Sequence, residues 1–294
     1  MRFKNVHVII NPATGKTEPV LSFLNDAFKG IKWEATVITP GLDAFSITKK
    51  LIGKTELIVV YGGDGSLSEV AGALCGTDTP MAIIPGGTAN VMSKELGIPQ
   101  DSRDALALIV DGPSKIMTID MGIANNMPFL LRINLGMMAD MVLLADDELK
   151  DNLGQMAYGV AALQTWMGAE PIRFGLLIDG EQVIEEGVSL TVTNAGNIGI
   201  GHFSFLPDMS VNDGFLDVIL LNDADLLSVL RVAGTTLLQT ESNVLKHWKC
   251  KQVSIFLEKS HSYVFDDCEK HAAEIHINIL PGALKVLIPY QHNN

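Results

Sequence analysis

The sequence has few cysteines and few basic residues, and each shortage argues against a class of protein. Its 294 residues include three cysteines, Cys75, Cys250 and Cys268, which are widely spaced and form no CxxC pair. Neither a disulfide framework nor a structural zinc site is therefore expected. The 21 Lys and Arg residues are outnumbered by 34 Asp and Glu, which gives a formal net charge of -13. This charge argues against nucleic acid as a partner and against electrostatic binding to anionic bilayers, because both need clustered basic residues.

A long apolar run is also missing. Stretches such as residues 6–10 and 137–145 end well before the roughly 18 residues that a membrane-spanning helix requires. The first of them leads directly into a Pro/Gly turn without a signal-peptide cleavage site. We therefore expect a cytoplasmic protein whose contact with a membrane, if it makes one, is transient, peripheral and apolar.

The pattern of apolar residues changes along the chain near residues 120–125. Before this point, short apolar runs alternate with helical patterns, which is typical of a parallel sheet covered by helices. Strands are predicted at residues 6–10, 34–38, 56–61 and 81–84, with helices at 20–28 and 44–51 and another from about residue 67. After it, strands of alternating polarity predict a β-rich, largely antiparallel domain. These strands are expected at 173–178, 188–193, 216–221, 253–257 and 274–279, with helices at 138–166 and 226–238.

Three glycine-bearing turns follow three of the predicted parallel strands. Their sequences are Asn11-Pro12-Ala13-Thr14-Gly15-Lys16, Gly62-Gly63-Asp64-Gly65-Ser66 and Pro85-Gly86-Gly87-Thr88-Ala89-Asn90. Open α/β sheets bind ligands at the carboxyl ends of their strands, glycine admits an anion close to the backbone, and helix N-termini supply N–H donors. Because neither a Walker A nor a GxGxxG pattern is present, the turns predict a phosphate site of another type.

Asp64 stands among these glycines, where its charge would repel a polyphosphate. It would be useful there if Mg²⁺ lay between them, or if the carboxylate oriented and deprotonated an attacking hydroxyl. The alternative is an ordinary tight turn, and within this segment alone the two interpretations have equal weight. The two further loops favour the catalytic interpretation.

The turns resemble motifs of the diacylglycerol kinase catalytic family, which is related to sphingosine kinases and more distantly to NAD kinases. The family's NPxSG looks like residues 11–15 with Thr14 for serine, and its GGDGTxxE looks like residues 62–69 with Ser66 for threonine. Residues 85–90 and 96–99 are similar to its PxGTxN and LGIP segments. In the second half, residues 206–207 and 213–217 resemble P…DGxLD, and Asp267-Cys268-Glu269 resembles DGE with its central glycine replaced.

This resemblance implies a two-domain fold. An α/β nucleotide-binding domain with a parallel sheet, like that of NAD kinases and diacylglycerol kinases, would span residues 1–122. A second, β-rich, sandwich-like domain that binds the acceptor would span residues 123–282, and residues 283–294 would return to the first domain. ATP and an apolar acceptor would enter the cleft between them, with the acceptor's tail partly against residues 137–144 and 156–166.

The resemblance also implies the site residues. The nucleotide would be lined by Asn11, Pro12, Ala13, Thr14, Gly15, Thr39, Gly62, Gly63, Gly65, Ser66, Leu67, Glu69 and Thr88. A structural Mg²⁺ in the second domain would be held by the Asp213 carboxylate and the backbone carbonyls of Ser210 and Phe215, which suits a cation that takes few carboxylates and keeps its waters. The alternative at Asp213 is a plain β-turn.

Two carboxylates are candidates for catalysis. We expect Glu269 to be the general base for the acceptor hydroxyl, while Asp64 positions Mg²⁺ and the phosphates. In an alternative division Asp64 is the base and Glu269 binds the acceptor head group. Without the resemblance, residues 266–269 would be interpreted as a solvated acidic turn.

The predicted function is ATP-dependent phosphorylation of a hydroxyl on diacylglycerol, a related lipid or another apolar acceptor. One alternative is an NAD kinase-like small-molecule kinase. Another is a non-catalytic nucleotide sensor, to which the departures from the family pattern at Ser68, Val91 and Cys268 point. The acceptor is not named by the sequence, and a homodimer is a further possibility.

Overall fold

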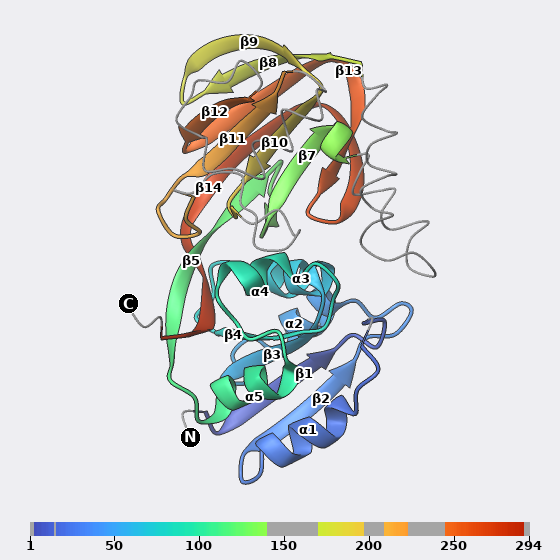
Figure 1. The fold of residues 1–294 in the computed structure, drawn as a ribbon, viewed down its shortest axis with the longest axis vertical. Helices are drawn as coiled ribbons and strands as arrows, with labels where there is room; N and C mark the ends of the chain where they lie inside the picture. The colour runs from blue at the N-terminus through green and yellow to red at the C-terminus, as the bar shows by residue number, and fades with distance from the viewer. Residues whose placement is uncertain (1–2, 15, 140–169, 197–208, 223–244, 291–294) are drawn as a thin grey trace.

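The chain forms two domains, one above the other, in the computed structural model (Figure 1). The structure describes residues 3–14, 16–139, 170–196, 209–222 and 245–290. All strands within these ranges belong to one 14-stranded hydrogen-bonded sheet that continues from one domain into the other. The helices predicted at residues 138–166 and 226–238 fall almost entirely outside these ranges.

The first domain contains a parallel sheet between two layers of helices. Its strands are β1 (Asn5–Ile10), β2 (Lys32–Val37), β3 (Leu57–Gly62) and β4 (Met81–Pro85). Its helices are α1 (Val20–Ala27), α2 (Ala44–Leu51), α3 (Asp64–Leu74), α4 (Val91–Glu95) and α5 (Ser102–Val110). All residues of β3 and β4 are buried, which explains why their sequences are continuously apolar.

The strand order in this sheet is β2-β1-β3-β4. The chain therefore moves in one direction from β1 to β2 and in the other from β2 through β3 to β4. Because crossovers between parallel strands are right-handed, α1 lies on one face of the sheet, and α2 and α3 lie on the other. In agreement, α1 packs against α5, whereas α2 packs against α3.

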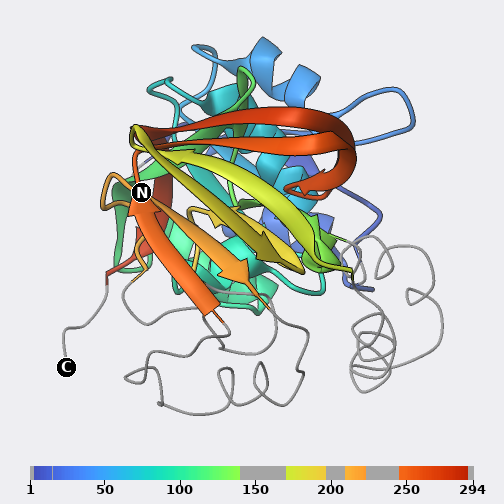
Figure 2. The ribbon, with the colours of Figure 1, turned by 90° about the horizontal axis from the view of Figure 1, so that it is seen from above.

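The second domain is built from antiparallel strands with a separate apolar core. Its strands are β6 (Met127–Phe129), β7 (Arg132–Gly136), β8 (Ile172–Ile178), β9 (Glu181–Gly187), β10 (Ser189–Thr193), β11 (Leu216–Leu221), β12 (Leu245–Cys250) and β13 (Gln252–Phe265). The order is β12-β11-β10-β7-β13, and the β8–β9 hairpin attaches to β13. Seen from above, the β13–β14 hairpin borders one side of the domain, and β11 and β12 lie on the other (Figure 2). Phe129, Phe174 and Phe265 belong to its core.

Two strands connect the domains. β5 (Ser114–Ala124) and β14 (Cys268–Pro289) are antiparallel to each other along most of their length. Val286 of β14 also pairs in parallel with Met81 of β4, so the last part of β14 completes the first domain's sheet. The change from one domain to the other thus falls within continuous strands, and the predicted boundary at residue 122 lies inside β5.

The carboxylate of Asp120 fixes the crossing point. Asp120 is 3% exposed, and its two oxygens accept the backbone N–H groups of Gly214 and Gly282, each at 2.7 Å. Its own N–H donates to the Val211 carbonyl at 2.7 Å. Gly282 lies where the pairing of β14 with β5 shifts its register. One side chain therefore joins β5, β14 and the turn before β11.

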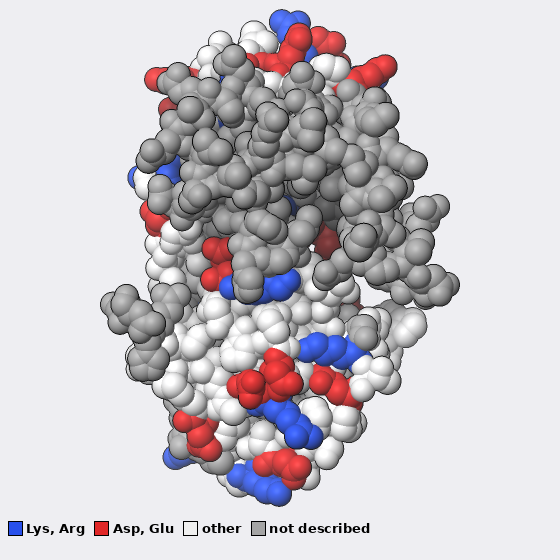
Figure 3. All heavy atoms as spheres, in the orientation of Figure 1, with Lys and Arg blue, Asp and Glu red and all other residues white. Residues whose placement is uncertain are grey.

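The surface of the first domain has charged side chains of both signs. On the face of the first domain seen in Figure 3, acidic and basic side chains are interspersed, and the basic ones form no continuous area there. In the part of the chain that the structure describes, no helix is both long enough and apolar enough to cross a bilayer.

Replacing Asp120 with Asn should destabilise the protein. One of the two glycine N–H donors would face an amide NH₂ in a buried place, so the free energy of unfolding should fall by about 1–3 kcal/mol. Urea denaturation would measure this. The matched control is Asp101→Asn, the exposed N-cap of α5, where Asn caps as well as Asp and little change is expected. Equal effects of the two substitutions would contradict the role of Asp120.

Candidate functional site

Three loops meet at the carboxyl ends of the parallel strands. The N–H of Asn11, after β1, donates to the Tyr61 carbonyl at 2.9 Å, and the N–H of Gly86, after β4, donates to the Gly62 carbonyl at 2.9 Å. The Asn11 amide also donates to the Ser66 hydroxyl at 2.8 Å. The crossovers from β1 and β3 leave toward opposite faces of the sheet, so this edge is the topological switch point, where α/β folds bind ligands in a crevice.

The loops after β3 and β4 touch through their glycines. A Cβ atom on Gly87 would lie 2.6 Å from the Cα atom of Gly63, and one on Gly63 would lie 3.2 Å from the Cα atom of Gly87. Any larger side chain at either position would push the loops apart. The contact therefore requires glycine at position 87 and favours it at position 63, and it leaves bare backbone there, which is how proteins approach phosphate groups.

Helix α3 begins at Asp64, three residues earlier than predicted, because the Gly63 carbonyl already accepts the N–H of Leu67 at 3.1 Å. The Gly-Asp-Gly segment is therefore the first turn of a helix. The N–H groups of that turn have no partner within the helix, and they carry the positive end of its dipole. An anion beside Gly63 would be stabilised by both.

The Asp64 carboxylate holds two helix N-termini together. Its Oδ2 accepts the Val91 N–H at 3.0 Å and its Oδ1 accepts the Met92 N–H at 3.2 Å, at the start of α4. Burial raises the pKa of the Asp64 carboxyl, and these two hydrogen bonds and the charges of Arg132 and Lys94 oppose that rise. Asp64 is thus placed in the crevice by α3 and oriented by α4.

Arg132 brings a buried positive charge from the second domain to this point. It lies on β7, is 6% exposed, and interacts electrostatically with Asp64, Asp266 and Glu95. Burial lowers the pKa of its guanidinium, and the three carboxylates raise it. Because Asp64 and Glu95 belong to the first domain, the arginine couples the two domains through charge.

Asp266, in the turn between β13 and β14, is the partner of Arg132 within the second domain. Its oxygens accept the backbone N–H groups of Leu130, Leu131 and Arg132 at 2.8–3.0 Å. Burial raises the pKa of its carboxyl, and these hydrogen bonds lower it. Its φ of 54° lies in the left-handed region, which Asp tolerates better than most residues. The interpretation of this turn as solvated is therefore wrong for Asp266.

The next residue touches the first domain. A Cβ atom on Gly65 would lie 1.8 Å from the Oδ2 atom of Asp267, so the carboxylate rests against the bare α-carbon of the first turn of α3. The β13–β14 turn thus reaches the N-terminus of α3. Two residues further along the chain is Glu269.

Glu269 points from β14 into a polar, solvent-accessible environment. Its side chain is 46% exposed, its Oε1 lies 3.9 Å from the His271 Nε2 atom, and the Ser262 hydroxyl donates to the same oxygen. Ser262 faces His271 across the hairpin, and Glu269 faces Val264. Because alternate residues of paired strands share a face, Glu269, His271 and Ser262 lie on one face of the hairpin.

Four of the residues predicted to bind nucleotide lie in different surroundings. Thr39, at the end of β2, and Thr88, after β4, are exposed at the same edge of the sheet as the loops. Leu67 is fully buried, so only its backbone could face a ligand. The Glu69 carboxylate accepts the Ala44 N–H at 2.7 Å and so binds the start of α2. Its assignment to the nucleotide site remains a prediction.

The loop after β1 folds onto the loop after β4. Pro12 and Ala13 are exposed, and the Ala13 N–H donates to the Asn11 side chain at 2.9 Å. The Thr14 side chain packs beside Gly86, where an added Cβ would lie 2.7 Å from its methyl group. Gly15 is outside the described residues.

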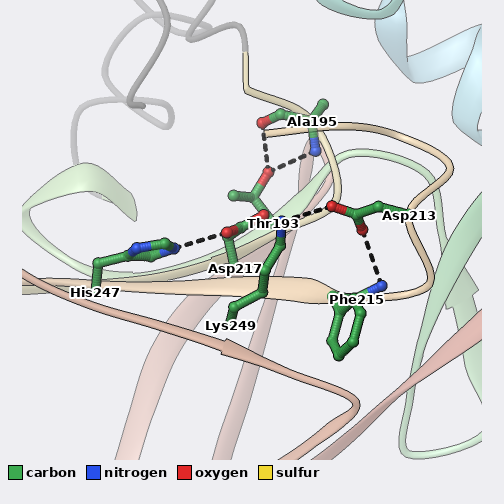
Figure 4. A network of polar contacts seen from close by, with 7 residues as sticks. All are labelled: Thr193, Ala195, Asp213, Phe215, Asp217, His247 and Lys249. Carbon is green, nitrogen blue, oxygen red and sulfur yellow. Dashed lines mark hydrogen bonds and ion pairs between the residues drawn. The ribbon is translucent and has the colours of Figure 1, made fainter. Parts of the chain in front are cut away.

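Among the predicted metal residues of the second domain, the Asp213 carboxylate has other partners. One oxygen of Asp213 accepts the Phe215 N–H at 3.0 Å, and the other is 2.6 Å from the Lys249 ammonium (Figure 4). The Ser210 hydroxyl donates to the Asn212 side chain at 2.8 Å. An ammonium group at the carboxylate does not fit a Mg²⁺ site, since it places positive charge where the cation would bind. Among the described residues, no group of three or more His, Cys, Asp or Glu converges as metal ligands.

Sequence reasoning missed four residues at the site: Lys16, Arg132, Asp266 and Asp267. The Lys16 ammonium donates to the carbonyls of Pro85 and Gln100 at 2.7 and 2.8 Å. A signal for Arg132 was present, because it is a single charge within a run of apolar residues that is buried as a strand. Lys16 and Asp267 stand within the quoted motifs and Asp266 within the acidic turn, but the sequence alone assigned none of them a contact.

Comparison with known proteins agrees with this geometry. Residues 5–124 match the family model of the diacylglycerol kinase catalytic domain, and residues 133–288 match that of the YegS C-terminal NAD kinase beta sandwich-like domain. The chain belongs to the diacylglycerol kinase catalytic family. The expected fold class, an α/β domain with a parallel sheet followed by a sandwich-like β domain, is thereby confirmed.

Individual relatives extend over both domains. The diacylglycerol kinase of Bacillus subtilis is 28% identical over 242 residues, which are 80% of this chain and 79% of that protein. That of Mycobacterium tuberculosis is 29% identical over 247 residues, 80% of this chain and 77% of that protein. A Bacillus anthracis crystal structure, described as a candidate diacylglycerol kinase, superposes with a TM-score of 0.82 at 26% identity and covers 99% of both chains.

Removing the Arg132 charge should destabilise the protein strongly. In Arg132→Met the buried carboxyl groups of Asp64 and Asp266 lose their counter-charge, and the free energy of unfolding should fall by about 3–5 kcal/mol. Urea denaturation measures this. The matched control is Arg173→Met, since Arg173 forms an exposed pair with Glu258 at 3.5 Å, and a loss below about 1 kcal/mol is expected there. A comparably small loss for Arg132→Met would show that the guanidinium is not the counter-charge.

Proposed function

We propose that the protein transfers the terminal phosphoryl group of ATP to a hydroxyl group of a lipid such as diacylglycerol. The contact between Gly65 and Asp267 carries this proposal. It brings the acidic turn of the second domain against the N-terminus of α3, where phosphates are expected, and leaves Glu269 two residues away. Membership of a kinase family and relatives named diacylglycerol kinase support it.

The first domain would hold the nucleotide. The bare backbone at Gly63 and Gly87 and the free N–H groups of the first turn of α3 suit a triphosphate, because they offer several donors at close range and a favourable dipole. Asn11 and Thr14 would border the same crevice from the loop after β1. These residues would position the nucleotide and take little part in bond breaking, as phosphoryl transfer requires.

Asp64 and Asp267 would face the phosphates from either side of the first turn of α3. Mg²⁺ bound with ATP would neutralise charge on the phosphate oxygens during transfer. Asp64 suits the task of orienting that complex, because the N–H groups at the start of α4 fix the direction of its carboxylate. Each of its oxygens can still accept a further bond after accepting one N–H.

The second domain would supply the base. Glu269 is exposed, so an acceptor hydroxyl can reach it, and the Ser262 hydroxyl fixes its orientation. The carboxylate would take the proton late in a loose transition state, when the hydroxyl has become acidic. Because this group belongs to the opposite domain from the phosphate loops, acceptor and nucleotide would approach the reaction from different sides.

The test is phosphorylation of a panel of acceptors by the purified chain with ATP and Mg²⁺. The panel contains diacylglycerol, phosphatidylglycerol, sphingosine, undecaprenol and NAD, and the phosphorylated products are separated and quantified. We expect a lipid product and none from NAD. Gly63→Val serves as the negative control, because its side chain would separate the phosphate loops. Phosphorylation of NAD alone would overturn the proposal, as would ATP binding without transfer to any acceptor.

The role of Glu269 is tested by Glu269→Gln. If Glu269 is the base, kcat should fall about 10²- to 10⁴-fold while KM for the acceptor changes little. Glu274→Gln is the matched control, because Glu274 is on the same strand, is similarly exposed and also lies beside a histidine, His276, at 2.9 Å. It should leave both constants unchanged. A Glu269→Gln enzyme that keeps its kcat and only raises KM would transfer the role of base to Asp64.

A further inference from the structure

The turn before β11 contains a carboxylate that is already neutralised by a side chain of the protein. Asp213 precedes Gly214, and its two oxygens are occupied by the Phe215 N–H and the Lys249 ammonium. The ammonium–carboxylate distance is 2.6 Å, with 24% of the aspartate side chain and 37% of the lysine side chain exposed. The pair is therefore only partly open to solvent.

Lys249 reaches this position because of the strand register. It lies on β12 directly opposite Asp217 of β11, just after the turn. Asp217 is itself engaged, since its Oδ1 is 2.7 Å from the His247 Nε2 atom (Figure 4). The lysine ammonium lies 2.6 Å from the Asp213 carboxylate.

The remaining charges around the turn also disfavour a divalent cation. The Phe215 ring has the ammonium groups of Lys249 and Lys251 at 5.9 and 5.5 Å from its centroid. Both oxygens of Asp120 are committed to backbone N–H groups, one of them that of Gly214. Two lysines therefore lie near the turn, and among the described residues the carboxylates of Asp120, Asp213 and Asp217 already have partners.

We propose that the Lys249 ammonium takes the place of a divalent cation at Asp213, so that the turn keeps its conformation without metal. Mg²⁺ needs near-octahedral oxygen ligands at about 2.0–2.1 Å, and an ammonium on the Asp213 carboxylate obstructs that shell and repels its charge. The turn matters because the Gly214 N–H bonds to Asp120 at the crossing between the domains. This assignment concerns the second domain alone and is independent of the proposed phosphoryl transfer.

The experiment compares thermal unfolding of the full chain without nucleotide, in EDTA and in millimolar MgCl₂. The wild-type Tm should be the same in both. In Lys249→Met the Tm should fall by a few degrees in EDTA, and MgCl₂ should restore much of the loss, because the Asp213 carboxylate becomes free to bind the cation. The double variant Lys249→Met/Asp213→Asn should not respond to MgCl₂.

The matched control is Lys246→Met. Lys246 is on the same strand and forms an ion pair with Glu185 at the same distance of 2.6 Å, so its loss should lower the Tm without any response to Mg²⁺. A wild-type Tm that falls in EDTA would overturn the proposal. So would a Lys249→Met variant that keeps the wild-type Tm or shows no Mg²⁺ response. Calorimetric titration of the wild type with MgCl₂ gives an independent test, since saturable binding that is lost in Asp213→Asn would also overturn the proposal.

Discussion

The arrangement of the two domains depends on a buried guanidinium. Arg132 belongs to the second domain by its strand, and two of its three carboxylate partners, Asp64 and Glu95, belong to the first. A charge so deeply buried is tolerated only when its partners are held in place, because the cost of removing it from water must be offset by fixed opposite charge. The Asp64 carboxylate, which lies where the glycine loops meet, is therefore also part of the contact between the domains.

Three buried carboxylates are stabilised in a common way, by backbone N–H groups. Asp64, Asp120 and Asp266 each accept backbone N–H groups from a different segment of the chain: the start of α4, the glycines of two turns, and residues 130–132. Such bonds are directional, and each fixes one element against another. All three carboxylates lie between the domains or beside the strands that cross from one domain to the other. Polar contacts thus set the geometry of the site, while the apolar cores stabilise each domain separately.

Much of the first domain could be predicted from the sequence, because its periodic patterns reflect burial. The helix at residues 44–51 and the strands after it are where the pattern placed them, whereas α3 begins at Asp64 and not at Leu67. That error has a physical reason, since Gly-Asp-Gly is a poor helix former and only the Gly63 carbonyl and the neighbouring loop favour a helical turn there. Convergence of the glycine loops followed from their position at strand ends. The contacts of Arg132, Asp266 and Asp267 could not be predicted, because they depend on how two domains meet.

The contact of the second domain with the start of α3 provides a route by which the proposed binding of nucleotide and acceptor would be coupled. Asp267 rests on Gly65, so a phosphate that approaches the start of α3 meets the carboxylate of the second domain as well as the N–H groups of the first. An anion alone would be repelled by Asp267 and attracted by the helix, whereas an anion that carries a cation would be attracted by both. The turn that bears Asp267 also bears Glu269. If nucleotide and acceptor bind as proposed, any displacement of the turn by the nucleotide would move Glu269 as well, and the charge of the ligand at α3 would affect the acceptor side of the site.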